Sequence, residues 1–104
     1  MIPVTVAARH GAIEPELRAR AEAIARRLGG QTPFAHEAVV VFDTAPMAGL
    51  VELRLHLAGG KVLVATGEAP EHRSALDQAE ARLRRQLEGP AVRPRRKGRG
   101  VARA

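Results

Sequence analysis

The chain has 104 residues, a length that suits one domain, and it contains no cysteine, which excludes disulfides and cysteine-based catalytic or metal sites. Its formal net charge of +6 is unevenly distributed. Residues 89–104 hold six of the 17 basic residues and no acid, so residues 1–88 hold the other eleven together with all 11 acids. The sequence therefore predicts a neutral domain at 1–88 and a basic tail at 89–104.

The N-terminal stretch MIPVTVAARH lacks the basic region and the long apolar core of a signal peptide. No apolar run approaches the roughly 18 residues that are needed to span a bilayer. We therefore expect a soluble protein that is located in the cytoplasm.

The first half of the chain predicts a strand, a helix and a second strand. Residues 2–7, IPVTVA, are β-branched and alternating, and Pro3 favours the start of a strand or the edge of a sheet. Residues 13–28 have apolar side chains at helical spacing, and the glycines at 29–30 are expected to end that helix. Residues 38–43, AVVVFD, predict the second strand.

The second half predicts a hairpin and a helix. We expect TAPMAG, residues 44–49, to form a loop. Residues 50–57, LVELRLHL, alternate, so one face of this strand is buried while Glu52, Arg54 and His56 lie on the other. The pair Gly59-Gly60 predicts a tight turn into a fourth strand at 61–66. A second helix follows at 71–88, before Gly89-Pro90.

The predicted order is β-α-β-β-β-α, which is an α+β fold. We expect the first two strands to pair in parallel through a right-handed crossover, and the remaining strands to form an antiparallel meander. The result is a four-stranded mixed sheet with two helices packed on one face.

The stretch RPRRKGRG, residues 93–100, has five positive charges and no acid. A block of like charge repels itself, so we expect residues 89–104 to be disordered until they meet a polyanion. Fully extended, this tail reaches roughly 50 Å. Contact with RNA phosphates is the favoured function, and a merely solubilising tail is the alternative. The candidate RNA-binding residues of the tail are Arg93, Arg95, Arg96, Lys97 and Arg99.

The predicted helices also carry arginines, which alternate with acids. An ordinary solvated helix face with i,i+4 ion pairs accounts for most of this pattern. The cluster at residues 82–85 differs, because it lies at the end of a helix and continues into the basic tail. The candidate RNA-binding residues of the helices are Arg18, Arg20, Arg26, Arg27, Arg82, Arg84 and Arg85.

The sequence contains no pattern that is typical of an enzyme or of a cofactor site. The four histidines do not have the spacing of a local metal motif, and neither glycine pair precedes a helix as a phosphate-binding loop does. The single serine, Ser74, lies within a helical pattern without a nucleophile motif. We therefore expect no catalytic activity, no metal, no cofactor and no small-molecule substrate.

Residues 57–87, LAGGKVLVATGEAPEHRSALDQAEARLRRQL, resemble the ribosome hibernation promoting factor family, also called ribosome-associated inhibitors or ribosomal subunit interface proteins. The segments ALD and RLRRQL carry most of this resemblance. Upstream, VTVAARHGAIEPELRARAEAIARRL is similar to the first strand and helix of the family. The predicted order of strands and helices is also that of the family. Two positions depart from its helix motif: Arg73 stands where a tyrosine is usual, and Glu71 where an aspartate is usual.

The resemblance implies binding to the small ribosomal subunit and its ribosomal RNA, in the channel that messenger RNA and transfer RNA occupy. Translation would stop, and inactive ribosomes would be preserved under stress or in stationary phase. Carried over by position, Arg18, Arg82 and Arg85 are the strongest RNA-contact candidates. Long members of the family add a dimerising domain, and a chain of 104 residues is expected to be a short form.

A general double-stranded RNA-binding module without ribosome specificity is the alternative, because helices on a small sheet suit that function as well. Two aromatic residues, Phe34 and Phe42, leave little capacity for stacking on single-stranded bases. Competition by free duplex RNA separates the two functions.

Overall fold

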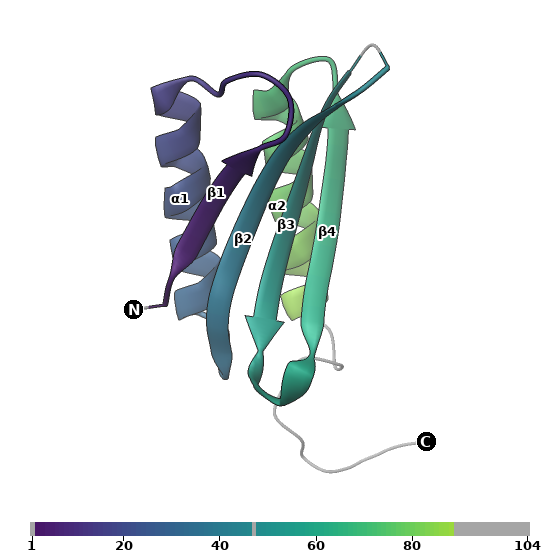
Figure 1. Ribbon diagram of the computed structural model, residues 1–104. Coiled ribbons are helices and arrows are strands. Elements are labelled where there is room, and N and C mark those ends of the chain that lie inside the picture. The colour runs from purple at the N-terminus through teal and green to yellow at the C-terminus, as the bar shows by residue number, and fades with distance from the viewer. Residues whose placement is uncertain (1, 47, 89–104) are drawn as a thin grey trace.

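The computed structural model describes residues 2–46 and 48–88, which form one sheet and two helices (Figure 1). The predicted β-α-β-β-β-α order is confirmed. The elements are β1 (Val4–Ala8), α1 (Pro15–Gly30), β2 (Ala35–Ala45), β3 (Ala48–Leu57), the 3₁₀ turn η1 (Ala58–Gly60), β4 (Val62–Ala69) and α2 (His72–Leu87).

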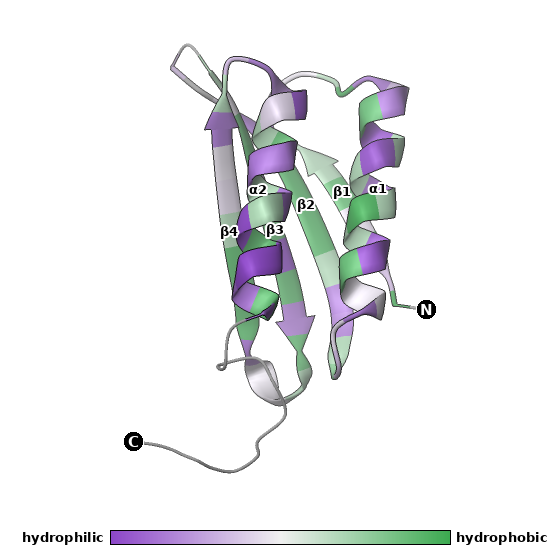
Figure 2. Ribbon diagram, turned by 180° about the vertical axis from the view of Figure 1, so that it is seen from behind, coloured by the Kyte–Doolittle hydropathy of each residue, from purple (hydrophilic) through white to green (hydrophobic). Residues whose placement is uncertain are grey.

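The strands lie in the order β1-β2-β3-β4, so β1 and β4 are the edges of the sheet. β1 pairs with β2 in parallel, whereas β2 with β3 and β3 with β4 are antiparallel, which confirms the predicted mixed sheet. Figure 2, which views the molecule from behind, shows that α1 and α2 both lie in front of the sheet on this side. The opposite side of the sheet has no helix over it in Figure 1 and is called the open face below.

The core lies between the helices and the sheet. β3 alternates strictly between buried and partly exposed residues, as its sequence predicts, and β4 follows the same period. The largest side chains that are fully buried come from both layers: Phe42, Leu28, Leu55, Leu76, Val40 and Val51. Each helix contributes its apolar stripe to this core, so the helix layer and the sheet stabilise each other.

The expectation of a loop at 44–49 is wrong. β2 continues to Ala45 and β3 begins at Ala48, with Thr44 paired to Gly49 in register. The glycine there is explained by close packing, because a Cβ atom on Gly49 would lie 2.9 Å from the imidazole ring of His72. Glycine in this strand therefore marks the approach of α2 and does not mark a loop.

The helix and strand boundaries differ by a few residues from those expected. α1 begins at Pro15, whose fixed φ and missing N–H suit the first turn, and Ile13 packs against the core from the preceding loop. β4 continues three residues beyond the predicted end at 66, because Gly67 belongs to the strand. A Cβ atom on Gly67 would lie 2.0 Å from the carbonyl oxygen of Ala75, so this glycine allows α2 to pack directly on β4.

Candidate nucleic-acid interface

The arginines of the two helices fall into three groups according to what they contact, and the first group lies along the edges of the sheet. Arg18 of α1 donates a hydrogen bond of 3.0 Å to the carbonyl oxygen of Val6 in β1. Arg82 of α2 donates one of 2.8 Å to the carbonyl oxygen of Thr66 in β4. Backbone groups at the edge of a sheet are otherwise available for pairing with another chain, so each arginine protects one edge.

Two glutamines extend this protection along β4. Gln86 donates to the carbonyl oxygen of Val64 at 2.8 Å, and the side-chain oxygen of Gln78 accepts from the backbone N–H of Glu68 at 3.2 Å. Gln78, Arg82 and Gln86 are spaced four residues apart, so they form one row on α2. The side chains of Gln78 and Arg82 therefore lie against the edge of the sheet.

The second group of arginines joins the two helices. Arg20 lies 2.8 Å from Asp77 of α2, whose hydrogen bond and negative charge raise the pKa of Arg20 further above its ordinary value. Arg27 of α1 and Arg84 of α2 both donate to the same oxygen of Glu80, Oε2, at 2.5 and 2.6 Å. The Arg84–Glu80 pair is the expected i,i+4 type, whereas the other two connect separate helices.

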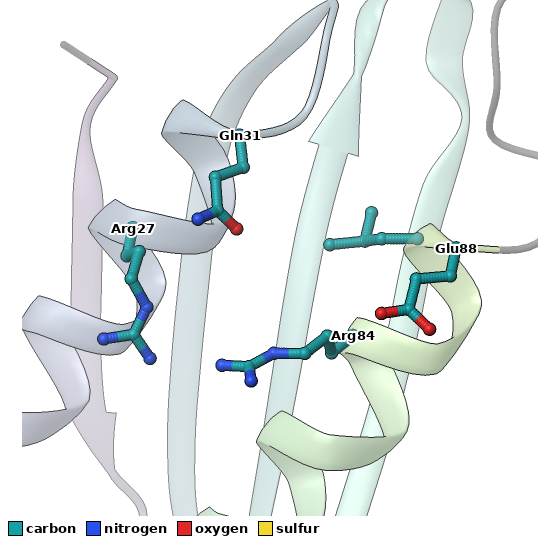
Figure 3. A pocket seen from close by; sticks show the side chains of 5 residues that line it. Arg27, Gln31, Arg84 and Glu88 are labelled. Carbon is teal, nitrogen blue, oxygen red and sulfur yellow. The ribbon is translucent and has the colours of Figure 1, made fainter.

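Figure 3 shows Arg27 and Arg84 extending toward each other between the helices. They line a pocket of about 410 Å³ near the C-terminal ends of α1 and α2, together with Gln31, Leu87 and Glu88. Arginines in a last helical turn also interact favourably with the negative end of the helix dipole. The second group therefore stabilises the arrangement of the helix layer.

The third group consists of Arg26 on α1, with Arg73 and Arg85 on α2. All three are exposed, and none has a hydrogen bond or an ion pair with any residue of the described ranges 2–46 and 48–88. Each guanidinium group therefore keeps its full set of donors for an external acceptor such as a phosphate. Arg26 and Arg85 are among the RNA-binding residues predicted from the sequence, whereas Arg73 is not.

The charges are sorted between the two sides of the sheet. By strand alternation and register, the open face carries four carboxylates, from Glu37, Asp43, Glu52 and Glu68, and two guanidinium groups, from Arg9 and Arg54. The remainder of residues 2–88 therefore has nine basic residues and seven acids, most of them on the helices. A domain that is neutral as a whole thus has an acidic open face and a basic helix layer.

A cluster at one end of the sheet surrounds Asp43. Its carboxylate lies 2.6 Å from Nδ1 of His10 and 3.6 Å from Arg9, and it accepts a hydrogen bond of 2.8 Å from the N–H of Thr44. The bond from Thr44 and then that from His10 lower the pKa of Asp43 below its ordinary value. His72 reaches the same residue, because its Nε2 donates to the backbone carbonyl oxygen of Asp43 at 2.7 Å.

The rings of His36 and His56 lie near each other, with centroids 6.4 Å apart. No group of three or more histidine, aspartate or glutamate side chains within 2–46 and 48–88 is arranged to hold a metal ion. His56 lies on the open face beside Glu52 and Arg54, as predicted, and the latter two form an ion pair of 2.7 Å.

Five candidate residues, Arg93, Arg95, Arg96, Lys97 and Arg99, lie outside the described residues, as does the whole tail 89–104. Within the part of the chain that the structure describes, neither helix is long and apolar enough to cross a membrane.

Comparison with protein-family models gives a match over residues 4–89 to the family of sigma 54 modulation protein and S30EA ribosomal protein. The match includes every helix and strand of the fold. The chain belongs to this family. The predicted resemblance to ribosome hibernation and ribosomal subunit interface proteins is thereby confirmed. The S30AE family consists of ribosome-associated regulators without enzymatic activity, and this membership confirms that the chain is not an enzyme.

Two solved structures share the fold of this S30AE member. A ribosomal subunit interface protein from Coxiella burnetii matches with a TM-score of 0.73 and 19% sequence identity, over 83% of this chain and 93% of that chain. The N-terminal domain of Protein Y from Thermus thermophilus matches with a TM-score of 0.69 and 24% identity, over 85% of this chain and 97% of that chain. No curated protein sequence matches the chain.

The arginines lie on the helices that the sequence predicts, but their different contacts do not follow from local sequence patterns. Arg20 and Asp77 are 57 residues apart, and Arg82 and Thr66 are 16 apart, so no local pattern links them. One signal was available in the sequence: Gln78, Arg82 and Gln86 share a helical row of long polar side chains. A row of that kind beside a predicted edge strand indicates protection of the edge.

Proposed function

We propose that this S30AE protein binds the small ribosomal subunit in the channel for messenger RNA and transfer RNA. Binding would exclude these ligands, stop translation and preserve inactive ribosomes in the cytoplasm under stress or in stationary phase. Family membership supports the ribosome as the partner. The resemblance of residues 57–87 to hibernation factors supports the channel as the site.

The main support for the proposal is that some arginines on the basic helix layer have no hydrogen bond or ion pair with any described residue. Arg26 and Arg85 offer guanidinium donors to ribosomal RNA without breaking any contact within the described fold. Arg18 and Arg82 each use one donor on a strand edge and keep further N–H groups, so they join the interface as rigidly held contacts. An acidic open face would repel RNA and would therefore point away from it.

The proposal divides the chain into a ribosome-binding domain at 1–88 and a basic tail at 89–104. The domain supplies shape and positioned arginines. The tail, with Arg93, Arg95, Arg96, Lys97 and Arg99, adds electrostatic attraction that is independent of RNA sequence and that speeds association.

Co-sedimentation with purified small ribosomal subunits tests this function. We expect the protein to pellet with the subunits, to be displaced when messenger RNA and initiator transfer RNA are added together, and to resist displacement by excess free duplex RNA. Failure to pellet at moderate salt would contradict ribosome binding. Equal displacement by any duplex RNA would instead support a general RNA-binding module.

A further inference from the structure

The open face of the sheet combines apolar and acidic residues. Val62 and Val64 of β4 are 42% and 41% exposed there, whereas the buried residues of β4 face the helices. Thr5 and Ala7 of β1 are exposed on the same face, so apolar and small side chains lie at both of its edges. A surface of this composition suits an extended peptide better than it suits a nucleic acid.

Two carboxylates on this face have no ion-pair partner within the described residues. The acids Glu52 and Asp43 are paired with Arg54 and Arg9, but no cation contacts Glu37 or Glu68 in residues 2–46 and 48–88. Glu37 of β2 is paired in register with His56 of β3, which is paired in turn with Val62 of β4. The open face therefore offers an exposed apolar strip on β4, with one unpaired carboxylate two strands away on β2 and another farther along β4.

The end of α2 lies at the edge of β4, the strand that carries that strip. Gln86, in the last turn of α2, donates its hydrogen bond to the backbone of Val64 across the edge of β4. The described chain therefore ends near the edge of the sheet that carries the exposed valines. Sixteen extended residues reach roughly 50 Å, and four strands spaced about 4.8 Å apart are crossed in less than half of that length.

We infer that the open face binds an extended arginine-rich peptide, and that residues 89–104 of the same chain are this peptide. The segment begins with Ala91 and Val92, which match the exposed valines, and continues with cations that match Glu37 and Glu68. It adds no strand to the sheet, because the outward backbone groups of Val64, Thr66 and Glu68 already bond to α2.

Attachment to the same chain favours this occupant over a separate peptide. A segment tethered beside its site has an effective concentration in the millimolar range, so weak charge pairs are sufficient to hold it. Docking of this kind conceals the tail when no polyanion is present and releases it when RNA competes for the same arginines. The inference concerns the isolated protein, and it holds or fails independently of ribosome binding.

The chain has no cysteine, so Gly98→Cys provides a single position for a nitroxide label in the full-length protein. We expect the label to reduce amide NMR signals of Val62, Val64 and their neighbours on β3 at low salt, while signals of α1 are unchanged. At 1 M salt, where the screening length falls to about 3 Å, these signals should recover.

The matched variants carry the same label and the same change of net charge. Glu37→Gln combined with Glu68→Gln should restore the open-face signals, whereas Glu16→Gln combined with Glu71→Gln, on the helix side, should leave them reduced. No loss of signal at low salt, an equal loss on both sides of the sheet, or a loss confined to the helices would overturn the inference.

A mixed sample distinguishes the chain's own tail from that of a second copy. Labelled protein without ¹⁵N is added to unlabelled ¹⁵N protein, and we expect no loss of signal in this mixture. A loss as large as that within one chain would show that a second copy occupies the face and would overturn docking within the same chain.

Discussion

The helix side and the open side of the sheet have different chemistry although the same strands build both. On the helix side, every second residue of β3 is buried beneath α1 and α2, and those helices carry more basic than acidic residues. On the open side, the intervening residues are half exposed and carry more carboxylates than guanidinium groups. A neutral total charge therefore conceals two surfaces that favour partners of opposite charge.

The two sides are expected to differ strongly in their contribution to stability. Leu55→Ala removes a side chain that is 1% exposed and should lower the free energy of unfolding by about 2–5 kcal/mol. Val64→Ala on the open face should lower it by about 0.5 kcal/mol or less. Urea denaturation of both variants measures the two values. Equal losses would contradict the assignment of the hydrophobic core to the helix side of the sheet.

The second comparison is between the domain and the tail. Deleting residues 91–104 removes cations but no core residue, so the fold should persist while binding to small subunits weakens. The slope of log affinity against log salt should flatten by roughly 0.7–0.9 for each phosphate contact that is lost. The control is a full-length variant in which the tail arginines are replaced by glutamine. An unchanged salt slope in both variants would assign the electrostatic contacts to the helices alone.

A third comparison separates arginines that hold the fold from arginines that are available to a partner. Arg82→Ala breaks the hydrogen bond to Thr66 and should cost about 0.5–1.5 kcal/mol of stability. Arg26→Ala breaks no described contact and should leave the melting temperature unchanged. Thermal unfolding of the two variants tests the assignment, which a larger loss for Arg26→Ala would contradict.

The smallest expected effect is a pH dependence at one end of the sheet. The pKa of Asp43 is lower in the folded chain than in the unfolded chain, so the charged carboxylate stabilises the fold above about pH 4. This stabilisation is lost as the pH falls through the folded pKa. Asp43→Asn should therefore flatten the melting temperature below about pH 4 relative to the parent. Parallel profiles for the two proteins would contradict this role of Asp43.

The fold could be predicted from the sequence because apolar and polar residues alternate clearly in a strand that is buried on one face only. LVELRLHL at 50–57 alternates without interruption, and the observed strand is buried at each expected position. The prediction failed at 44–49, where Pro and Gly indicate a loop but the β2–β3 ladder continues through Thr44 and Gly49. The reason for that glycine is the imidazole ring of His72, which no local pattern reveals.

The candidate site was predicted in composition but not in geometry. Charge spacing identified arginines on both helices, and it could not show that Arg27 and Arg84 share one oxygen of Glu80. Likewise, the open face was predicted from alternation at Glu52, Arg54 and His56, whereas its net acidity depends on strand pairing. Contacts between distant segments therefore decide which of the predicted arginines are already engaged within the described fold.

The most direct test of the helix side as the ribosome-binding side is a matched pair of double variants in co-sedimentation with small ribosomal subunits. Arg26→Gln with Arg85→Gln removes two charges from the helix layer, and Arg9→Gln with Arg54→Gln removes two from the open face. We predict that the first pair weakens binding by about 3–6 kcal/mol, at about 1.5–3 kcal/mol for each charged hydrogen bond. The second pair should leave binding within about threefold of the parent. An equal or larger loss for the open-face pair would contradict the assignment of the ribosome-binding surface to the helices.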